Sequence, residues 1–210
     1  ASWFLDGVFL NYNSSYLERM LEQLLDEAES PEVTRFLRAV DVRIDGFRVE
    51  KAPEWRGQRV FVRHEVDGKG YELRLSEESA GTQKLMGLAA YLMTALERGA
   101  TVVVDELDAK LHPKLLRYVI LLFKDPEVNK SGAQLIFSSQ DVSTMRNDVF
   151  RRDEIWFAAR GEGEASQLWS LADIHEANGN LVSKNAAFDK QYLSGRYGAD
   201  PYLTRIEEWD

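Results

Sequence analysis

The stretch TVVVDELDAKLHP, residues 101–113, brings three carboxylates directly after a run of β-favouring residues. Residues 101–104 predict a short buried strand, and Asp105, Glu106 and Asp108 follow it. Neighbouring acids repel one another and lose hydration when they approach a protein core. The cluster therefore indicates either a bound cation at the end of the strand or an acidic turn that stays in solvent.

Helical and strand-like patterns alternate on both sides of this stretch. Leucines at helical spacing predict an upstream helix that ends at Gly99. Residues 113–124 predict a second helix, and residues 134–137 predict a second strand. Strands and helices alternate in this way when crossover helices join parallel strands. The middle of the chain is therefore expected to be an α/β fold.

The two ends of the sequence have more mixed patterns. They predict helices over residues 14–29 and 31–39, and strands over residues 42–51, 58–66, 71–75, 153–158 and 167–171. The segment Asp67-Gly68-Lys69-Gly70 is expected to connect two of these strands as a hairpin. We divide the chain accordingly into a helical and β-hairpin segment, residues 1–75, and a C-terminal lobe, residues 76–210.

Composition and charge exclude several classes of protein. Of the 210 residues, 44% are hydrophobic and 11% aromatic, which is ample for a packed core and excludes a disordered chain. The absence of cysteine excludes disulfides and thiolate metal sites. A net charge of −9 leaves room only for a local nucleic-acid-binding patch. Because no apolar run approaches roughly 20 residues and no signal peptide opens the sequence, we expect a cytoplasmic protein without a membrane partner.

Asp105 and Glu106 stand at the carboxyl end of the most hydrophobic predicted strand, where ligands collect in parallel sheets. A hydrophobic strand that ends in Asp-Glu matches the Walker B pattern of nucleotide hydrolases. In that pattern the Asp helps to hold Mg²⁺, and the Glu orients the water that attacks the γ-phosphate of ATP. The pattern alone does not separate this function from a solvated acidic turn.

Two further polar segments lie at the ends of predicted elements. Ser79-Ala80-Gly81-Thr82-Gln83 opens a helix, whose free backbone N–H groups and positive dipole end suit a phosphate. An ordinary serine cap with a glycine turn is the alternative. The segment Ser138-Ser139-Gln140-Asp141 follows the second strand, and its alternative is a plain connecting loop.

The order of these three segments resembles a known family. The chain resembles the C-terminal part of an ABC-type ATPase of the SMC/RecF/OLD group, in particular the AAA-type ATPases linked to abortive infection and phage defence. The resemblance covers residues 70–203. The matching pieces are SEESAGTQKL as the signature motif, TVVVDELDAKLHP as Walker B and D-loop, AQLIFSSQD as the switch segment, and the typical C-terminal pieces RRDEIWFA and YLSGRYGADP.

The resemblance implies a fold, a cofactor pair and a set of roles. The fold is the C-terminal part of an ABC-type P-loop ATPase, with a mixed sheet, crossover helices and a helical and β-meander N-terminal segment. The ligands are ATP and Mg²⁺. Asp105 is expected to associate with Mg²⁺, Glu106 to be catalytic and Gln140 to stand at the switch position. The signature residues, which are expected to contact a nucleotide held by the opposite subunit, are Ser79, Gly81, Thr82 and Gln83. The D-loop residues, expected at the dimer interface, are Leu107, Asp108 and Ala109. His112 is expected to be structural, because Leu-His-Pro begins the next helix.

Two features depart from the family pattern. No G-x-x-x-x-G-K-[ST] motif occurs in the sequence, so nothing in it is expected to cradle the β-phosphate. We expect an upstream P-loop region, on the same polypeptide or on another, and weak binding of ATP by this chain alone. Gln140 stands where the family usually has His. It can bind a phosphate or water by hydrogen bonds but carries no charge, so we expect slow hydrolysis.

The function implied is ATP binding and hydrolysis by a homodimer or higher oligomer with ATP sandwiched between its subunits. Its ATP state would gate an effector protein or a DNA-processing partner in anti-phage defence. The alternative from another class is a nucleotide-sensing or scaffolding module with little or no turnover. A nuclease is a third reading, disfavoured because the acids do not recur on several strand ends.

Overall fold

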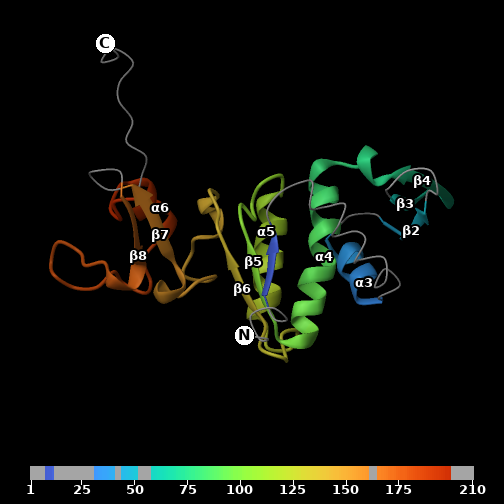
Figure 1. The fold of residues 1–210 in the computed structure, drawn as a ribbon. Coiled ribbons are helices and arrows are strands. Elements are labelled where there is room, and N and C mark those ends of the chain that lie inside the picture. The colour runs from blue at the N-terminus through green and yellow to red at the C-terminus, as the bar shows by residue number, and fades with distance from the viewer. Residues whose placement is uncertain (1–7, 12–30, 41–43, 52–57, 161–164, 200–210) are drawn as a thin grey trace, which may run out of the picture. The chain divides into compact units, whose positions relative to one another are not determined.

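The computed structural model describes residues 8–11, 31–40, 44–51, 58–160 and 165–199 (Figure 1). The chain divides into two compact units, residues 1–140 and 141–210, which are considered separately. The helix predicted over residues 14–29 lies outside the described residues. The motif-based division at residues 75 and 76 stays a prediction.

The centre of the first unit is a parallel sheet. It contains β1 (Val8–Asn11), β5 (Thr101–Val104) and β6 (Gln134–Phe137) in the order β1-β5-β6, with both pairings parallel. Helix α5 (Pro113–Lys124) connects β5 to β6 and contacts β6. The predicted crossover and its two strands are confirmed to the residue. The sequence patterns did not predict β1.

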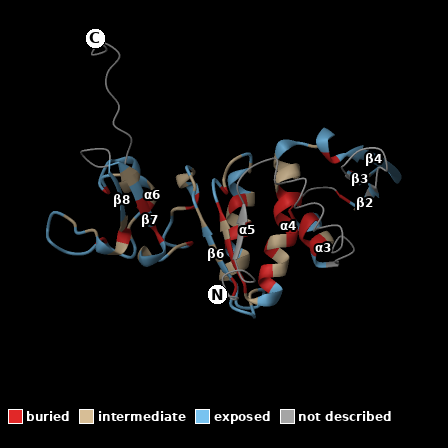
Figure 2. Cartoon of the chain, in the orientation of Figure 1, coloured by how far each residue is buried: buried red, intermediate tan, exposed pale blue. Residues whose placement is uncertain are grey.

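Two further helices pack in the first unit. Helix α4 (Ala80–Arg98) is capped by Ser79 and ends at Gly99, whose φ of 70° suits a residue without a Cβ. Its buried face carries the predicted leucines and appears along the helix in Figure 2. Helix α3 (Pro31–Ala39) packs against α4, and its Phe36 ring lies 6.3 Å from the Tyr118 ring of α5. Both helices confirm the sequence prediction.

An antiparallel meander leads into α4. Strands β2 (Gly46–Lys51), β3 (Gln58–Val66) and β4 (Lys69–Arg74) pair in that order. The predicted four-residue connection is wrong, because Lys69 already pairs with Val66 and leaves only Asp67 and Gly68 in the turn. Both turn residues have positive φ, 52° and 73°, as a two-residue hairpin with right-handed twist requires. A 3₁₀ turn, Leu75–Glu77, joins the meander to the start of α4.

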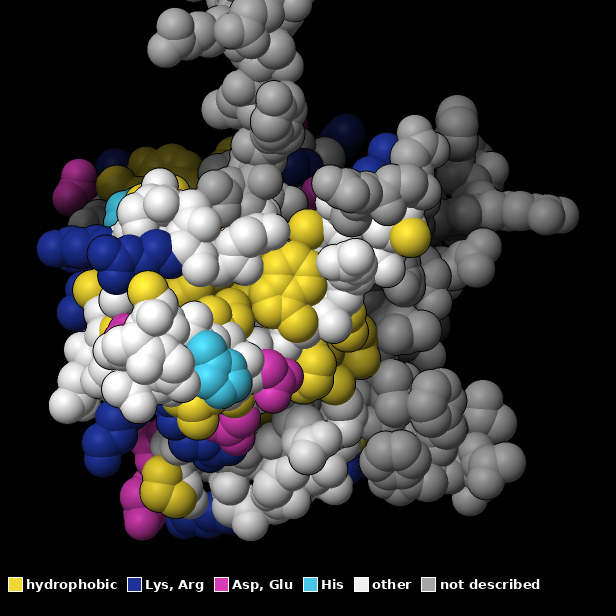
Figure 3. Space-filling model, turned by 90° about the vertical axis from the view of Figure 1, so that its left-hand side faces the viewer, with side chains coloured by type: hydrophobic (Ala, Val, Ile, Leu, Met, Phe, Trp, Pro, Cys, Tyr) yellow, Lys and Arg dark blue, Asp and Glu magenta, His cyan; other side chains and the backbone are white. Residues whose placement is uncertain are grey.

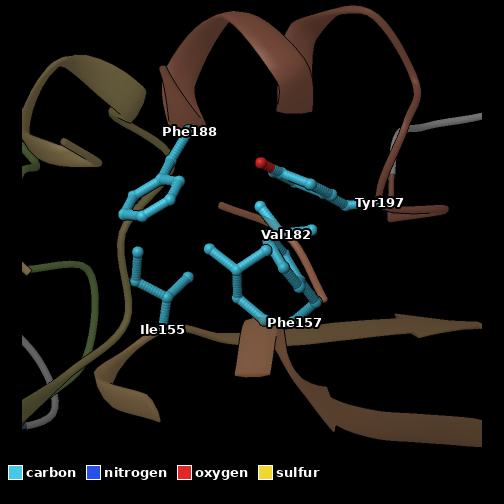
Figure 4. Close-up of a cluster of buried hydrophobic side chains, with 6 residues drawn as sticks. Ile155, Phe157, Val182, Phe188 and Tyr197 are labelled. Atoms are coloured by element: carbon cyan, nitrogen blue, oxygen red, sulfur yellow. The ribbon is translucent and has the colours of Figure 1, made fainter. Parts of the chain in front are cut away.

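The second unit is built on a hairpin of β7 (Trp156–Arg160) and β8 (Ser166–Ser170), with the short helix α6 (Phe188–Leu193). The strand predicted over residues 153–158 begins later because residues 152–154 form a 3₁₀ turn. In the second-unit core, Phe157 of β7 and the preceding Ile155 face Phe188 of α6 and Tyr197, which follows that helix (Figure 4). This core consists of Ile155, Phe157, Leu171, Val182, Phe188 and Tyr197.

The surface of the second unit is mixed. Several large apolar side chains are exposed, including Trp156 and Leu168 of the hairpin. On the face drawn in Figure 3, hydrophobic side chains lie among charged ones of both signs.

Across the described ranges of both units, no helix is long and apolar enough to cross a membrane. The predicted α/β class with a crossover helix and a β-meander is confirmed, and the described parallel and antiparallel strands belong to separate sheets.

Candidate active site

The candidate site lies where β5 and β6 end. The register pairs Val104 with Phe137, so the next residues of the two strands, Asp105 and Ser138, leave the sheet side by side. The Ser138 hydroxyl donates to Oδ1 of Asp105 and accepts the backbone N–H of Glu106 at 2.8 Å. One hydroxyl thereby uses its donor and an acceptor position to join the Asp105 carboxylate to the backbone of Glu106. We call Asp105, Glu106 and Asp108 the acidic edge.

Asp108 connects the acidic edge to the predicted switch segment. Its Oδ2 accepts the backbone N–H of Gln140, with a separation of 3.3 Å. Its Oδ1 is buried and has no hydrogen-bond partner among the described residues. The Gln140 side chain is exposed, as are those of Asp105 and Glu106. The acidic edge therefore combines carboxylates open to a ligand with one carboxylate that organises the backbone.

The backbone of Glu106 has an unusual conformation. Its φ is 48°, in the left-handed region that costs an L-residue about 1 to 2 kcal/mol. The carbonyl oxygen accepts the Ala109 N–H at 3.0 Å and the Lys84 Nζ at 2.5 Å. Together with the Ser138 contact to its N–H, these bonds hold both sides of the residue. A conformation of this kind persists only where its surroundings fix it, and it is frequent at functional sites.

Lys84 reaches the acidic edge from α4. Its ammonium group donates to the Glu106 carbonyl across 22 positions of sequence. Burial lowers the pKa of Lys84 below its ordinary value, and the nearby charges of Asp108 and Glu106 oppose that shift. The positive charge of Lys84 offsets part of the repulsion among the carboxylates of the acidic edge.

The predicted signature turn is held by its own polar groups. Ser79 Oγ accepts the Thr82 N–H at 3.1 Å and lies 2.8 Å from the Thr82 hydroxyl. The side-chain amide of Gln83 donates to the carbonyl of Glu78 at 2.8 Å. The Glu78 carboxylate in turn lies 2.6 Å from Nε2 of His64 on β3. The first turn of α4 is thus fixed from inside and from the meander.

Gly81 brings the predicted signature turn onto the predicted D-loop of the same chain. A Cβ added at Gly81 would lie 2.7 Å from the backbone oxygen of Lys110, a distance that real Cβ atoms do not adopt. Lys110 itself has a φ of 65°. The glycine is therefore required by a backbone approach within the chain, whether or not a phosphate also approaches it.

The structure distinguishes the three predicted D-loop residues. The Leu107 side chain is fully buried, and its N–H donates to the Ser138 carbonyl at 3.0 Å. Asp108 and Ala109 are partly exposed. Of these three residues, only Asp108 and Ala109 therefore keep part of their side chains at the surface. His112 caps α5 through Nδ1, which accepts the Lys114 N–H at 3.1 Å, in agreement with its predicted structural role.

The donor set suits a partly hydrated Mg²⁺. Carboxylate oxygens are ligands that Mg²⁺ prefers, and it usually keeps several waters and substrate phosphate oxygens. Asp105 offers such an oxygen at an exposed strand end. No group of three or more His, Asp or Glu side chains able to hold a metal occurs in the part of the chain that the structure describes. The residues present fit a cation shared with a phosphate better than a metal held by protein alone.

Sequence reasoning missed two residues of this site. Ser138 was part of the polar segment after β6, but only the strand register shows that it lies between Asp105 and Glu106. Lys84 stood inside the quoted signature motif without a role. Its position five residues after the helix cap could have signalled a side chain near the start of α4, although not its partner.

Comparisons with known proteins address the family. One similar solved structure is the Smc head domain with a coiled coil and joint derived from Pyrococcus yayanosii, with 18% identity, a TM-score of 0.48, and coverage of 76% of this chain and 28% of that chain. Another is the SmcHead bound to the C-winged helix domain of ScpA, with 18% identity, a TM-score of 0.42, and coverage of 69% and 42%. This chain thus spans less than half of either structure's length.

A search of curated proteins gave no match. A family model described as "AAA domain, putative AbiEii toxin, Type IV TA system" matches residues 2–146, more than half of the chain. The match includes the predicted signature turn, the acidic edge and the predicted switch segment, and it agrees with the resemblance drawn from these motifs. The chain belongs to this family of AAA ATPase domains.

Proposed function

We propose that this chain supplies the Walker B, D-loop, signature and switch parts of a dimerising ABC-type ATPase. The observation that carries the proposal is the arrangement of Asp105, Ser138 and Glu106 at the carboxyl end of the parallel sheet. There, two carboxylates stay exposed, while one hydroxyl group joins the Asp105 carboxylate to the backbone N–H of Glu106. A solvated acidic turn would need neither the shared serine nor the left-handed Glu106.

Each residue of the acidic edge has a chemical task in this proposal. Asp105 would hold Mg²⁺, which when bound neutralises charge on the phosphates. Glu106 would orient the attacking water and accept its proton. Asp108 holds the backbone at Gln140, so that the exposed amide of Gln140 can bind the water or the γ-phosphate by hydrogen bonds.

The nucleotide would lie between two subunits. Ser79, Gly81, Thr82 and Gln83 would face the γ-phosphate of ATP bound to the partner subunit. A P-loop that this sequence does not contain would hold the β-phosphate. The close approach of Gly81 to the backbone of Lys110 supports this arrangement, because the predicted signature turn and D-loop then lie together on the same chain. Gating of an effector or a DNA-processing partner in phage defence rests on the resemblance drawn from the sequence motifs alone, and cytoplasmic location stays a prediction.

A nucleotide-sensing or scaffolding module with little turnover is the second candidate. It is favoured by Gln140, which places a neutral side chain at the predicted switch position. The backbone N–H of Gln140 donates to Asp108. The ATPase and a nucleotide-sensing module both require nucleotide binding by the complete protein, and they differ in whether Glu106 activates water. A scaffolding module requires only a partner.

The test is Glu106→Gln in the complete, P-loop-containing protein. The change keeps the shape of the side chain and removes its basicity, so ATP binding should persist while turnover falls on the order of 10²- to 10⁴-fold. Steady-state hydrolysis and calorimetric ATP binding measure the two quantities. Glu97→Gln, at an exposed acid near the other end of α4, is the matched control and should change neither.

Each other outcome has a defined meaning. An unchanged rate in Glu106→Gln would remove the catalytic role of this residue. ATP binding without measurable turnover in the unaltered protein would favour the sensing module. No ATP binding by the complete protein would overturn the ATPase and the nucleotide-sensing module and would leave only a scaffolding module.

A further inference from the structure

We propose that Lys84 is a positioning residue, which keeps Glu106 in its left-handed backbone conformation and so aims the Glu106 carboxylate at the reacting water. The catalytic consequence rests on the proposed ATPase function. The backbone part of the proposal concerns this chain alone and can be tested without nucleotide.

The first support is the contact itself. Lys84 Nζ lies 2.5 Å from the Glu106 carbonyl oxygen, a short separation for a charge-assisted hydrogen bond. The carbonyl belongs to the residue with a φ of 48°, and the same oxygen also accepts the Ala109 N–H. Rotating Glu106 toward an ordinary conformation would move this carbonyl, and the lysine contact would be lost.

The second support is the origin of the lysine. Lys84 extends from the first turns of α4, the helix whose start carries the predicted signature residues. Gly81 of the same turn lies against the backbone of Lys110 in the D-loop. Two independent contacts therefore connect the start of α4 to the loop that begins at Asp105. A shift of the signature turn would pass to Glu106 of the same chain through Lys84.

The third support is the charge around the ammonium group. Asp108, Glu106 and Asp105 favour its charged form, while burial and Lys110 disfavour it. A neutral side chain of the same length would leave these carboxylates without a compensating charge and the carbonyl without this donor. The role therefore requires both the donor and the charge, a combination that arginine retains and methionine lacks.

The first experiment measures the backbone of Glu106 in the full 210-residue chain. Backbone carbon chemical shifts from NMR would be compared for the unaltered chain, Lys84→Met, Lys84→Arg and the control Lys114→Met, an exposed lysine at the start of α5. Lys84→Met should lose the left-handed signature at Glu106, while Lys84→Arg and the control should keep it. Retention of that signature in a folded Lys84→Met chain would overturn the proposal.

If Lys84→Met does not fold, Lys84→Gln provides the milder change, because it keeps a hydrogen-bond donor but is shorter and neutral. It should shift the Glu106 signals in the same direction. A folded Lys84→Gln chain with an unchanged Glu106 would overturn the proposal equally.

The second experiment measures ATP turnover by the complete protein. A displaced catalytic group can cost up to about 100-fold in rate, so Lys84→Met should lower kcat by that order with little change in KM. Lys84→Arg should restore part of the rate. In a Glu106→Gln background, Lys84→Met should cause no further loss, since the group that it positions is already inactive. A purely structural lysine would instead lower both backgrounds alike.

The two proposals fail differently. If the unaltered protein shows no turnover, the ATPase function fails while the NMR comparison still decides the backbone role of Lys84. If the unaltered protein hydrolyses ATP and Lys84→Met keeps its full kcat, the ATPase function stands and the positioning role is wrong.

Discussion

The acidic edge of the first unit and the core of the second unit differ in how far their side chains are buried and in whether their polar groups have partners. Every member of the second-unit core is at most 8% exposed, and its single hydroxyl, on Tyr197, donates to Gln191 at 2.7 Å. The acidic edge keeps exposed carboxylates, a left-handed Glu106 and a buried oxygen without a partner among the described residues. Backbone strain, exposed charge and an unpaired polar atom in one place are expected where a bound ligand completes a site.

The largest expected effect is a loss of stability in the second-unit core, and it would sharpen the comparison between the two regions. Phe188 is 1% exposed and faces Phe157 and Tyr197, so Phe188→Ala leaves a cavity and should destabilise the second unit by about 3 to 5 kcal/mol. Amide hydrogen exchange should accelerate in β7 and β8. Slow exchange in β5 should persist, because that strand belongs to the other unit. Equal acceleration in both places would mean that the units unfold together.

A middle-sized effect could break the comparison, because it gives a site residue a role in packing. Gly81→Ala would place a Cβ 2.7 Å from the Lys110 carbonyl oxygen and should lower the free energy of unfolding by about 1 to 3 kcal/mol. The matched control is Gly70→Ala, where an added Cβ meets nothing within 4 Å. Denaturant unfolding of the two variants measures the difference. Equal stability would show that the close approach at Gly81 relaxes freely.

The smallest effect concerns the hydroxyl of the core. Burial raises the pKa of Tyr197 to about 12, above an unfolded value of about 10. Because the folded pKa is raised, the neutral phenol stabilises the fold below pH of about 10, and this contribution is lost as pH rises through about 12. Tyr197→Phe removes the hydrogen bond and should cost about 1 kcal/mol at neutral pH.

The measurement for Tyr197 combines unfolding with absorbance. The stability difference between Tyr197→Phe and the unaltered chain should shrink as pH rises through the folded pKa. The tyrosinate absorbance should lose its latest titrating component in the variant. A stability difference that is constant with pH would assign the role of Tyr197 to its ring alone.

The sequence predicted the helices and strands that carry the site better than it predicted which strands pair and in what register. Helix α4, β5, α5 and β6 were anticipated because a serine cap, a glycine stop, a proline start and runs of β-favouring residues act locally. Strand β1 was missed, because four residues acquire a strand conformation here by pairing with β5. The hairpin turn was predicted two residues too long, because the pairing of Val66 with Lys69 depends on the register.

The sequence by itself determined that two acids end the central strand, that a capped helix precedes them and that a polar segment follows the next strand. Only the tertiary structure decided that Ser138 joins Asp105 to Glu106 and that Lys84 holds the Glu106 carbonyl. The physical reason is range. Caps, turns and strand propensity depend on residues a few positions apart, whereas these contacts join residues 22 to 33 positions apart and exist only after the sheet register and the packing of α4 have brought them together.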